Sequence, residues 1–431
     1  MQKIVLDYVV SAPAGALGHT ACQAVSLLRR GDREQARRLY REVVAGDPGE
    51  ATTWSTLAVF ALLERDIPSA DAHVRRALER SPDCVDALVN LSLVLLAQGK
   101  SQAIFPVLKR AVALAPDHSK ALANYGTMLH AARDHAAADE YLRRAAEASP
   151  ASWRIALERA SVSRTRGDFE QMRERLLSAL ALVPAALPDR LVALPRKAPH
   201  QASDLEQVLC EAGDQLREAG QPFHLMAGTL LALVRNGALL GHDKDIDLAL
   251  PWDSDRDRVA EMFGRHPGFA APPHPSSDGR LWAFSVIHKA SRVGIDLFFL
   301  KPEADGVLAG CGKPPQMLFS RVRPFELGEL RWRDRTWAIP SPPEQYLEDI
   351  YGPAWRTPDP YFDTMLSNPS RTADSVRVAV SIGLVRLGDA LQAQDWLKAH
   401  ALCRQLLARE AIAEVVAVEA ALRQRCPQVP A

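Results

Sequence analysis

The chain has 431 residues, which at about 150 residues per domain predicts two or three domains with hydrophobic cores. Hydrophobic residues make up 47% and charged residues 24%. These values are near the averages of globular proteins and exclude a disordered or fibrous chain. Lysine plus arginine and aspartate plus glutamate both number 52, so the formal net charge is zero. A nucleic-acid partner, which would be attracted by a cationic field, is therefore not expected.

Cysteine usage and apolar runs bear on the compartment. Six cysteines are spread along the chain without a C-x-x-C pair or a dense disulfide framework, which predicts a reducing compartment. The first residues lack the long apolar core of a signal peptide. No run of about 18 apolar residues predicts a transmembrane helix. We therefore expect a cytoplasmic protein without a transmembrane segment, either free or peripherally bound to a membrane.

A repeat with a period of 34 residues occupies the first half of the chain. Small residues recur 24 and 12 positions before a recurring proline, where the two helices of a hairpin must approach closely. The prolines are Pro48, Pro82, Pro116, Pro150 and Pro184. Proline lacks the backbone donor that a helix needs, so we expect each one to end the second helix of its hairpin.

This pattern resembles an array of tetratricopeptide (TPR) repeats, about five units over residues 17–186. Each helix–turn–helix has too small a core to fold alone, so the units stack into an all-α superhelix with a concave face. The resemblance implies a protein partner on that face, and a passive scaffold is the alternative. His130 and His135 lie at one hairpin turn without further metal ligands, so we expect both to be solvated.

The pattern changes on either side of the repeats. Residues 1–16 precede them as a separate segment, and prolines mark a linker at 187–202. The region 203–370 mixes strand-like runs with helices, which predicts an α+β domain. Residues 371–431 are again helical in pattern and are expected to form a short cap. We expect helices at 203–220, 253–263, 343–351, 373–387 and 396–408 with a break at 388–389, strands at 223–227, 245–250, 281–288 and 294–300, and a loop or lid at 265–279.

Acidic side chains interrupt two apolar strands. Successive side chains of a strand alternate between its faces, so Asp243, Asp245 and Asp247 share one face while Ile246 turns to the core. Asp296 is the single charge in the middle of a second apolar strand. Neighbouring carboxylates repel unless a cation lies between them, and Mg²⁺ or Mn²⁺ prefers such oxygen ligands. The alternative is an edge strand whose polar face lies in water.

Gly228 and Thr229 follow the strand expected at 223–227 and precede a helix. Backbone amides at a helix N-terminus bind phosphate, which makes this turn a candidate phosphate site. An ordinary turn with Thr229 as the N-cap is the alternative. Arg235 contacts either a phosphate or an acid on its own helix face. His242 is either a general base or a hydrogen-bonding neighbour of the acids.

Four motifs in this order resemble the LicD/fukutin family of the nucleotidyltransferase-fold superfamily, over roughly residues 203–365. They are Gly228-Thr229-Leu230-Leu231 with Arg235 and Gly237, Asp243-Lys244-Asp245-Ile246-Asp247, Asp296 on its strand, and a closing segment with Tyr346, Leu347, Tyr351, Gly352, Trp355, Thr357 and Pro358. The resemblance implies a catalytic Mg²⁺ or Mn²⁺ held by Asp245, Asp247 and Asp296. It implies contacts to substrate or nucleotide from Gly228, Thr229, Arg235, Asp243 and Lys244.

The activity that the resemblance implies is that of a metal-dependent phosphotransferase. Such an enzyme moves a substituted phosphate group, carrying an alditol, choline or similar, from a CDP-linked donor to a glycan or glycoconjugate acceptor in cell-surface polysaccharide biosynthesis. The repeat array would dock the acceptor or a protein partner. Two alternatives stay open. One is a TPR adaptor whose C-terminal domain is silent or regulatory, and the other is a nucleotidyltransferase that releases pyrophosphate.

Overall fold

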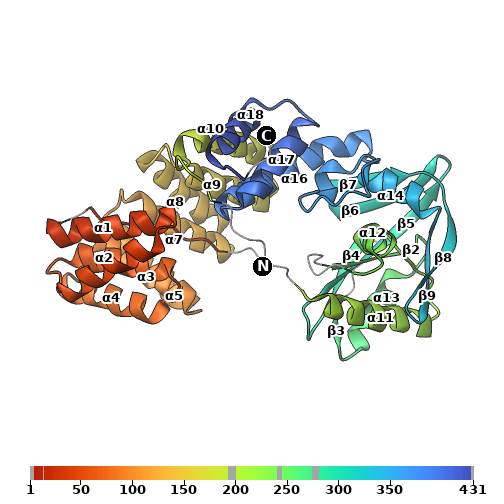
Figure 1. Ribbon diagram of the computed structural model, residues 1–431, viewed down its shortest axis with the longest axis horizontal. Coiled ribbons are helices and arrows are strands. Elements are labelled where there is room, and N and C mark those ends of the chain that lie inside the picture. The colour runs from red at the N-terminus through yellow and green to blue at the C-terminus, as the bar shows by residue number, and fades with distance from the viewer. Residues whose placement is uncertain (1–3, 13, 193–199, 240–244, 274–280, 429–431) are drawn as a thin grey trace. The chain divides into compact units, whose positions relative to one another are not determined.

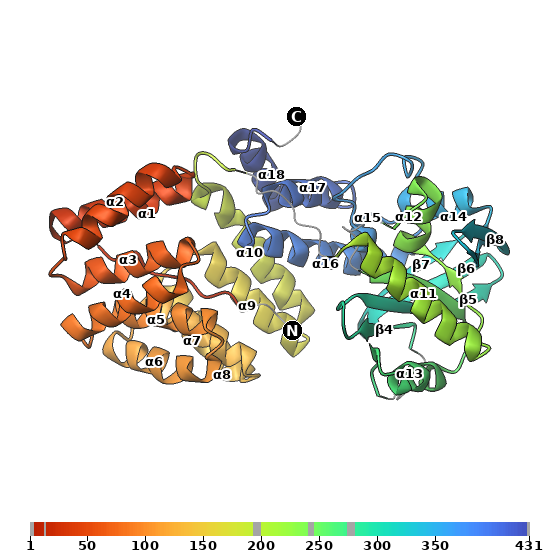
Figure 2. The ribbon, with the colours of Figure 1, turned by 60° about the horizontal axis from the view of Figure 1, so that its bottom comes forward.

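The computed structural model describes residues 4–12, 14–192, 200–239, 245–273 and 281–428 (Figures 1 and 2). The chain divides into two compact units. The first comprises residues 1–192 and 413–431, and the second comprises residues 193–412. The cap expected at 371–431 is thus shared between the units, and its last helix belongs to the first.

The first unit is built from successive helix hairpins, as the 34-residue period predicts (Figure 1). The helices of each hairpin pack against each other, and α3, α5, α7 and α9 begin 34 residues apart. The pairs are α1 (Gly15–Arg30) with α2 (Arg33–Ala45), α3 (Ala51–Leu63) with α4 (Ile67–Arg80), α5 (Val85–Ala97) with α6 (Ser101–Leu114), α7 (Ser119–Ala131) with α8 (His135–Ala148), and α9 (Trp153–Arg166) with α10 (Phe169–Ala186). Helix α18 (Ala413–Arg425) packs against α10.

Aspartates begin the second helix of four hairpins. Each carboxylate accepts the amide of the residue three positions ahead, which gives a partner to an N–H group that a helix start leaves unpaired. These N-caps are Asp32, Asp66, Asp134 and Asp168. The prolines follow α2, α4, α6 and α8 as predicted, but Pro184 lies inside α10, which continues to Ala186. That part of the prediction is wrong, because one proline near a helix end removes only one hydrogen bond.

Small residues lie at the helix crossings, where the sequence pattern placed them. Gly126 of α7 is one of them, since a Cβ built on it would lie 2.8 Å from Cγ of Leu142 on α8. His130, at the end of the same helix, is only 5% exposed, and its Nε2 lies 3.0 Å from Oγ1 of Thr165. The expectation that His130 is solvated is wrong. Burial and the neighbouring His135 lower its pKa to about 4.

The second unit contains a mixed sheet in the strand order β1-β2-β5-β4-β3. β2 and β5 are parallel, and the other pairs are antiparallel. β6 joins the far end of β5 and pairs with β7, while β8 and β9 form a separate hairpin. The strands are β1 (His224–Leu225), β2 (Asp245–Pro251), β3 (Phe269–Ala270), β4 (Ala283–His288), β5 (Gly294–Glu303), β6 (Gly306–Lys313), β7 (Gln316–Val322), β8 (Glu326–Trp332) and β9 (Arg335–Ser341).

Helices pack on this sheet and enclose one apolar core. They are α11 (Ala202–Glu218), α12 (Ala227–Asn236), α13 (Arg256–Arg265) and α14 (Pro343–Tyr351). The helices α15 (Thr364–Ser367), α16 (Ala373–Gln392) and α17 (Trp396–Leu407) come after them in the chain and contribute no residue to this core. The fully buried Trp337 of β9 fits against α11 at Gly213, where a Cβ would lie 2.8 Å from the indole ring. Figure 2 shows α11 lying along the strands of this unit.

Three local expectations differ from the structure. The strand expected at 223–227 is limited to β1, because α12 already begins at Ala227. α16 continues to Gln392 through the expected break at 388–389, and the buried Gly388 is one of its helical residues. The loop expected at 265–279 contains β3, and its part at 274–279 lies outside the described residues.

We predict that Gly126→Leu destabilises the repeat array. The added side chain must displace Leu142, and overpacking of this kind costs about 1–3 kcal/mol. Ala131→Leu adds a similar side chain at an exposed position of the same helix and is expected to change stability by less than about 0.5 kcal/mol. Urea unfolding followed by far-ultraviolet circular dichroism compares the two variants. Equal midpoints for both would contradict the close contact.

Candidate functional site

Two acids predicted on separate strands meet on one face of the sheet. β2 and β5 run parallel in a register that places Asp247 beside Asp296 and Asp245 beside Gly294. Ile246 of β2 alternates with the acids and is 1% exposed. The alternation expected from the sequence is therefore present, with carboxylates on one face of the sheet and aliphatic side chains on the other.

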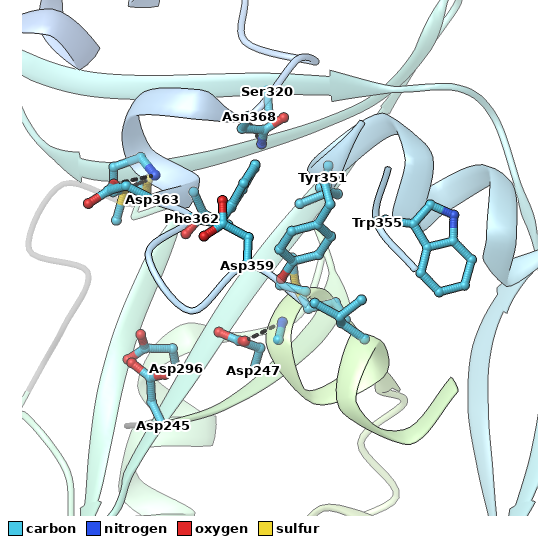
Figure 3. A pocket seen from close by; sticks show the side chains of 18 of the residues that line it. Asp245, Asp247, Asp296, Ser320, Tyr351, Trp355, Asp359, Phe362, Asp363 and Asn368 are labelled. Atoms are coloured by element: carbon cyan, nitrogen blue, oxygen red, sulfur yellow. Dashed lines mark hydrogen bonds between the residues drawn. The ribbon is translucent and has the colours of Figure 1, made fainter. Parts of the chain in front are cut away.

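Asp245 and Asp296 lie side by side at the floor of the site (Figure 3). Asp296 also accepts a hydrogen bond from the hydroxyl of Ser285, its register partner on β4. Burial raises the pKa of Asp296 above its ordinary value, and the hydrogen bonds with Ser285 and Asp245 offset part of that rise. Two carboxylates this close repel each other unless a positive charge lies between them.

Asp247 is held by the start of α12. The backbone N–H of Gly228 donates to Oδ2 of Asp247 at 2.8 Å, as the dashed line in Figure 3 marks. In return, the backbone N–H of Asp247 donates to Oγ1 of Thr229 at 2.8 Å. A Cβ on Gly228 would lie 3.0 Å from the same carboxylate oxygen, so glycine allows the close approach. Thr229 is 2% exposed and lies inside the helix, whose N-cap is Met226.

The closing motif of the sequence supports α12 from the other side. Tyr346 is buried in α14 and accepts a hydrogen bond from the backbone N–H of Ala227, the first residue of α12. Burial raises the pKa of Tyr346, and the charge of Asp247 adds to the rise. Ala227 has φ of 43°, a left-handed conformation that is uncommon for a residue with a side chain. Strained backbone of this kind persists where the surroundings hold it, often at functional sites.

Arg235 binds the second part of that motif. Its guanidinium donates to the carbonyl of Trp355 at 3.2 Å, while Trp355 itself is 5% exposed. Gly352 of the closing motif lies where α14 ends and has φ of 81°, a conformation that favours glycine. Arg235 therefore ties α12 to the segment after α14. It also lines the pocket described next.

A pocket of about 850 Å³ opens above the acids. Its lining includes Asp245, Asp247 and Asp296 on the floor and Gly228 at the start of α12. Aromatic side chains form one wall, and the rings of Tyr351 and Phe362 have centroids 5.3 Å apart. Thr229 does not line the pocket, because its side chain is directed to the backbone of β2.

Sequence reasoning missed a group of pocket residues beyond the predicted domain boundary at 370. They are Arg371, Arg386, Asp389 and Lys398, and the last three lie on α16 and α17. Arg386 forms an ion pair with Asp363, which is 7% exposed. Arg371 donates to the hydroxyl of Ser320 at 2.9 Å and to backbone carbonyls before α16. No local pattern marks these residues, since Arg371 lies in an irregular segment and the other three look like ordinary polar residues on helices.

Three other residues considered from the sequence cannot be placed. Asp243 and Lys244, expected to contact substrate, and His242 lie outside the described residues. Their predicted roles stay predictions.

The donor chemistry of the floor fits a hard divalent cation. Carboxylate oxygens are the ligands that Mg²⁺ and Mn²⁺ prefer, and the adjacent Asp245 and Asp296 could bind a cation between them. Asp247 is turned toward Gly228 in the arrangement that the structure shows. Within the described part of the chain, no three His, Cys, Asp or Glu side chains converge closely enough to hold an ion. Asp247 would therefore have to turn from Gly228 to join the other two.

Two regions of the chain match known family models. Residues 220–309 match the family described as LicD/FKTN/FKRP, nucleotidyltransferase domain. Residues 23–70, 64–119 and 119–152 match tetratricopeptide repeats. The first match contains Gly228 and the acids of β2 and β5, whereas the closing motif and the helices α16 and α17 lie beyond it.

Curated relatives resemble part of the chain. Ribitol-5-phosphate transferase FKTN of Mus musculus and the human protein of the same name are each 26% identical over 172 residues, which cover 38% of this chain. The match spans 36% of the length of these relatives.

Solved TPR structures also match. A thermophilic TPR protein of Thermus thermophilus is 18% identical with a TM-score of 0.36, over 39% of this chain and 92% of that one. PilF of Pseudomonas aeruginosa is 21% identical with a TM-score of 0.34, over 47% of this chain and 90% of that one.

No described helix is both long and apolar enough to cross a membrane.

We predict that Thr229→Val destabilises the second unit while Thr229→Ser does not. Valine has the shape of threonine but cannot accept the backbone N–H of Asp247, and a buried donor without a partner costs about 1–3 kcal/mol. Serine keeps the acceptor oxygen. Urea unfolding followed by tryptophan fluorescence measures both variants. If valine were as stable as wild type, the bond between Thr229 and Asp247 would have no structural role.

A second prediction concerns pH. His224 of β1 is 7% exposed, and burial lowers its pKa to about 4 from an ordinary value of 6.5. The unfolded chain therefore takes up this proton first, and the free energy of unfolding falls as the pH drops from about 6.5 to 4. The full loss is about 3 kcal/mol.

The test compares the wild type with His224→Leu, which cannot titrate, and with His266→Gln as a control on the same unit. The urea midpoint of the wild type is expected to fall more steeply between pH 7 and pH 4.5 than that of His224→Leu. The control is expected to follow the wild type. Parallel pH profiles for all three proteins would show that His224 does not control acid stability.

Proposed function

Because the chain joins N-terminal TPR repeats to a LicD-type nucleotidyltransferase domain, we propose that it is a transferase of substituted phosphate groups. The donor is a CDP-linked alditol, choline or similar compound, and the acceptor is a hydroxyl of a glycan or glycoconjugate. The relatives are named for ribitol 5-phosphate, which makes a CDP-linked pentitol the first donor to test. The reaction would serve cell-surface polysaccharide synthesis, with the repeat array docking the acceptor or a protein partner.

One observation carries the proposal: acids of two separate strands are brought together beneath a pocket large enough for a nucleotide-linked substrate. Pockets that bind small molecules usually have volumes of about 300–1,000 Å³. An isolated carboxylate in an apolar strand would be costly. Grouping such carboxylates at the floor of a pocket fits a site that handles phosphates together with a cation.

The proposed cofactor is Mg²⁺ or Mn²⁺, held by Asp245 and Asp296 with Asp247. When bound, it would neutralise charge on the diphosphate of the donor. Two of the cationic side chains that line the pocket, Arg235 and Lys398, would add positive charge for the same anion. The aromatic wall at Tyr351 and Phe362 provides a flat apolar surface for a nucleobase or sugar ring.

The chemistry is a displacement at phosphorus. The acceptor hydroxyl oxygen forms a bond to the distal phosphorus of the CDP-linked donor, and the bond from that phosphorus to the bridging oxygen breaks. CMP leaves with the bridging oxygen, and a carboxylate of the floor takes the hydroxyl proton. The main work of the protein is to hold the two reactants in line, which can supply about 7–11 kcal/mol of the barrier.

We predict that CDP and CTP bind in the presence of Mg²⁺ or Mn²⁺, and that Asp245→Asn combined with Asp247→Asn abolishes the metal-dependent part. Titration calorimetry with and without the ion measures this binding. Asp253→Asn is the matched control, because Asp253 is an exposed acid just past the end of β2 and does not line the pocket. Metal-dependent binding that survives in the double variant would count against the site.

The released product separates the proposal from its alternatives. CMP release from a CDP-linked donor supports phosphotransfer. Pyrophosphate release from CTP instead supports a nucleotidyltransferase. A full-length protein that binds no nucleotide with either ion favours an adaptor whose second unit is silent.

A further inference from the structure

Residues 4–12 lie against the repeat helices of the first unit. They form neither helix nor strand, yet Leu6 and Val9 are each only 8% exposed. Leu6 packs in a cluster with Leu95 and Met128, and Val9 packs with Val89. A segment without secondary structure of its own is thus buried on the array.

Two asparagines bind the backbone of this segment in the same way. Oδ1 of Asn124 on α7 accepts the N–H of Asp7, and its Nδ2 donates to the carbonyl of Asp7, both at 2.8 Å. Asn90 on α5 makes the same two bonds to Val9, again at 2.8 Å. Both asparagines are buried, at 2% and 0% exposure. Binding of alternate residues on one side is the pattern of an extended chain.

The spacing of the asparagines equals the period of the repeat. Asn90 and Asn124 are 34 residues apart, so they occupy equivalent positions of consecutive units. Cys22 occupies the equivalent position of the first repeat, and its Sγ lies 3.5 Å from the carbonyl of Ser11. Two consecutive repeats therefore hold alternate residues of an extended chain through the same buried amide side chain.

Basic side chains of the array also contact the segment. Lys120 and Arg154 each lie four residues before the position that the asparagines occupy in their own repeats. Lys120 donates to the carbonyl of Tyr8 at 2.7 Å, and Arg154 lies 3.5 Å from the carboxylate of Asp7. These two residues are also 34 apart. On α1, Nε of Arg29 donates to the hydroxyl of Tyr8 at 2.8 Å. Arg154 and Arg29 thus contact the side chains of an acid and of the tyrosine that follows it, whereas Lys120 and the asparagines contact only backbone that any sequence offers.

We propose that the face carrying Asn90, Asn124, Lys120, Arg154 and Arg29, here called the clamp groove, is a peptide-binding site that residues 4–12 fill in cis. Its external occupant is a segment of a partner protein with the same chemistry. That segment is extended, with an aspartate followed by an aromatic residue and aliphatic residues on either side. Two buried side-chain amides each bind the N–H and the carbonyl of one residue of the segment. Hydrogen bonds to the main chain are the bonds by which proteins hold an extended peptide.

Filling in cis sets a threshold for the partner. Residues 4–12 are joined to α1 at Gly15, so their effective concentration at the groove is on the order of millimolar. A partner segment must bind more tightly than residues 4–12 do at that effective concentration, or it must bind when residues 4–12 are displaced. This inference does not depend on the transferase reaction, because all of its contacts lie within the first unit.

The experiment uses the full chain and a labelled peptide, Ile-Val-Leu-Asp-Tyr-Val-Val-Ser-Ala, copied from residues 4–12. In an open variant, Val9→Pro removes the N–H that Asn90 accepts, and Asp7→Lys reverses the charge facing Arg154. Fluorescence anisotropy is expected to show about tenfold or more tighter peptide binding to the open variant than to wild type. Adding Asn90→Leu and Asn124→Leu to the open variant is expected to abolish binding.

Controls separate the groove from general effects. Thr56→Val changes the position equivalent to Asn90 in the preceding repeat. The Thr56 hydroxyl donates to the carbonyl of Thr52 on its own helix, so the variant is expected to leave peptide binding unchanged. A peptide with lysine in place of its aspartate is expected to bind at least about tenfold more weakly, since it would face Arg154 with a like charge. Equal binding of the two peptides would overturn the stated partner chemistry.

Three further results would overturn the proposal. The first is equal peptide binding by the wild type and the open variant, and the second is no binding by a folded open variant. The third is a wild-type dimer that dissociates in the open variant, which would make the occupant a second copy of the chain. Hydrogen exchange on the wild type is independent of all variants. The amides of Asp7 and Val9 are expected to be protected, and fast exchange there would contradict filling in cis.

Discussion

The second unit depends on the parallel pairing of β2 with β5. Because side chains alternate along a strand, this register places Asp247 and Asp296 on one face and directs Ile246 and Ile295 to the core. A shift of one residue would move every acid into the core and every aliphatic side chain to the pocket. Burying a carboxylate without a partner costs far more than one ladder hydrogen bond contributes. The apolar core and the candidate site therefore select the same register.

The start of α12 lies between two supports that are far apart in the sequence. From one side β2 holds it, through the bonds that join Gly228 and Thr229 to Asp247. From the other side, the closing motif holds the first residue of α12 through Tyr346 and the end of the same helix through the bond from Arg235 to the carbonyl of Trp355. This arrangement gives the aromatic and glycine residues of that motif a physical role. They fix the helix that bonds to an acid of the pocket floor.

The sequence predicted the parts of the fold whose periodicity repeats or alternates. The 34-residue period located the hairpins, and the apolar alternation around Asp247 and Asp296 located the two central strands. The hairpins from β6 to β9 were missed, because their strands mix polar and apolar residues without the strict alternation seen in β2. The pocket wall on α16 and α17 could not be predicted either. Residues such as Arg386 reach the pocket only through tertiary packing, and nothing in their local pattern distinguishes them from solvated helix residues.

The order of segments along the chain has a consequence for how the protein is made. The first unit is discontinuous, because α18 returns to pack against α10 after the whole of the second unit. Arg425 then binds the carbonyls of Pro184 and Leu187, and its own carbonyl accepts the N–H of Leu191. At about 5–20 residues per second, the ribosome needs roughly 10–45 s to add residues 193–412. During that interval the face of α10 that packs against α18 lacks its partner helix, so the nascent chain exposes this face until α18 has been made.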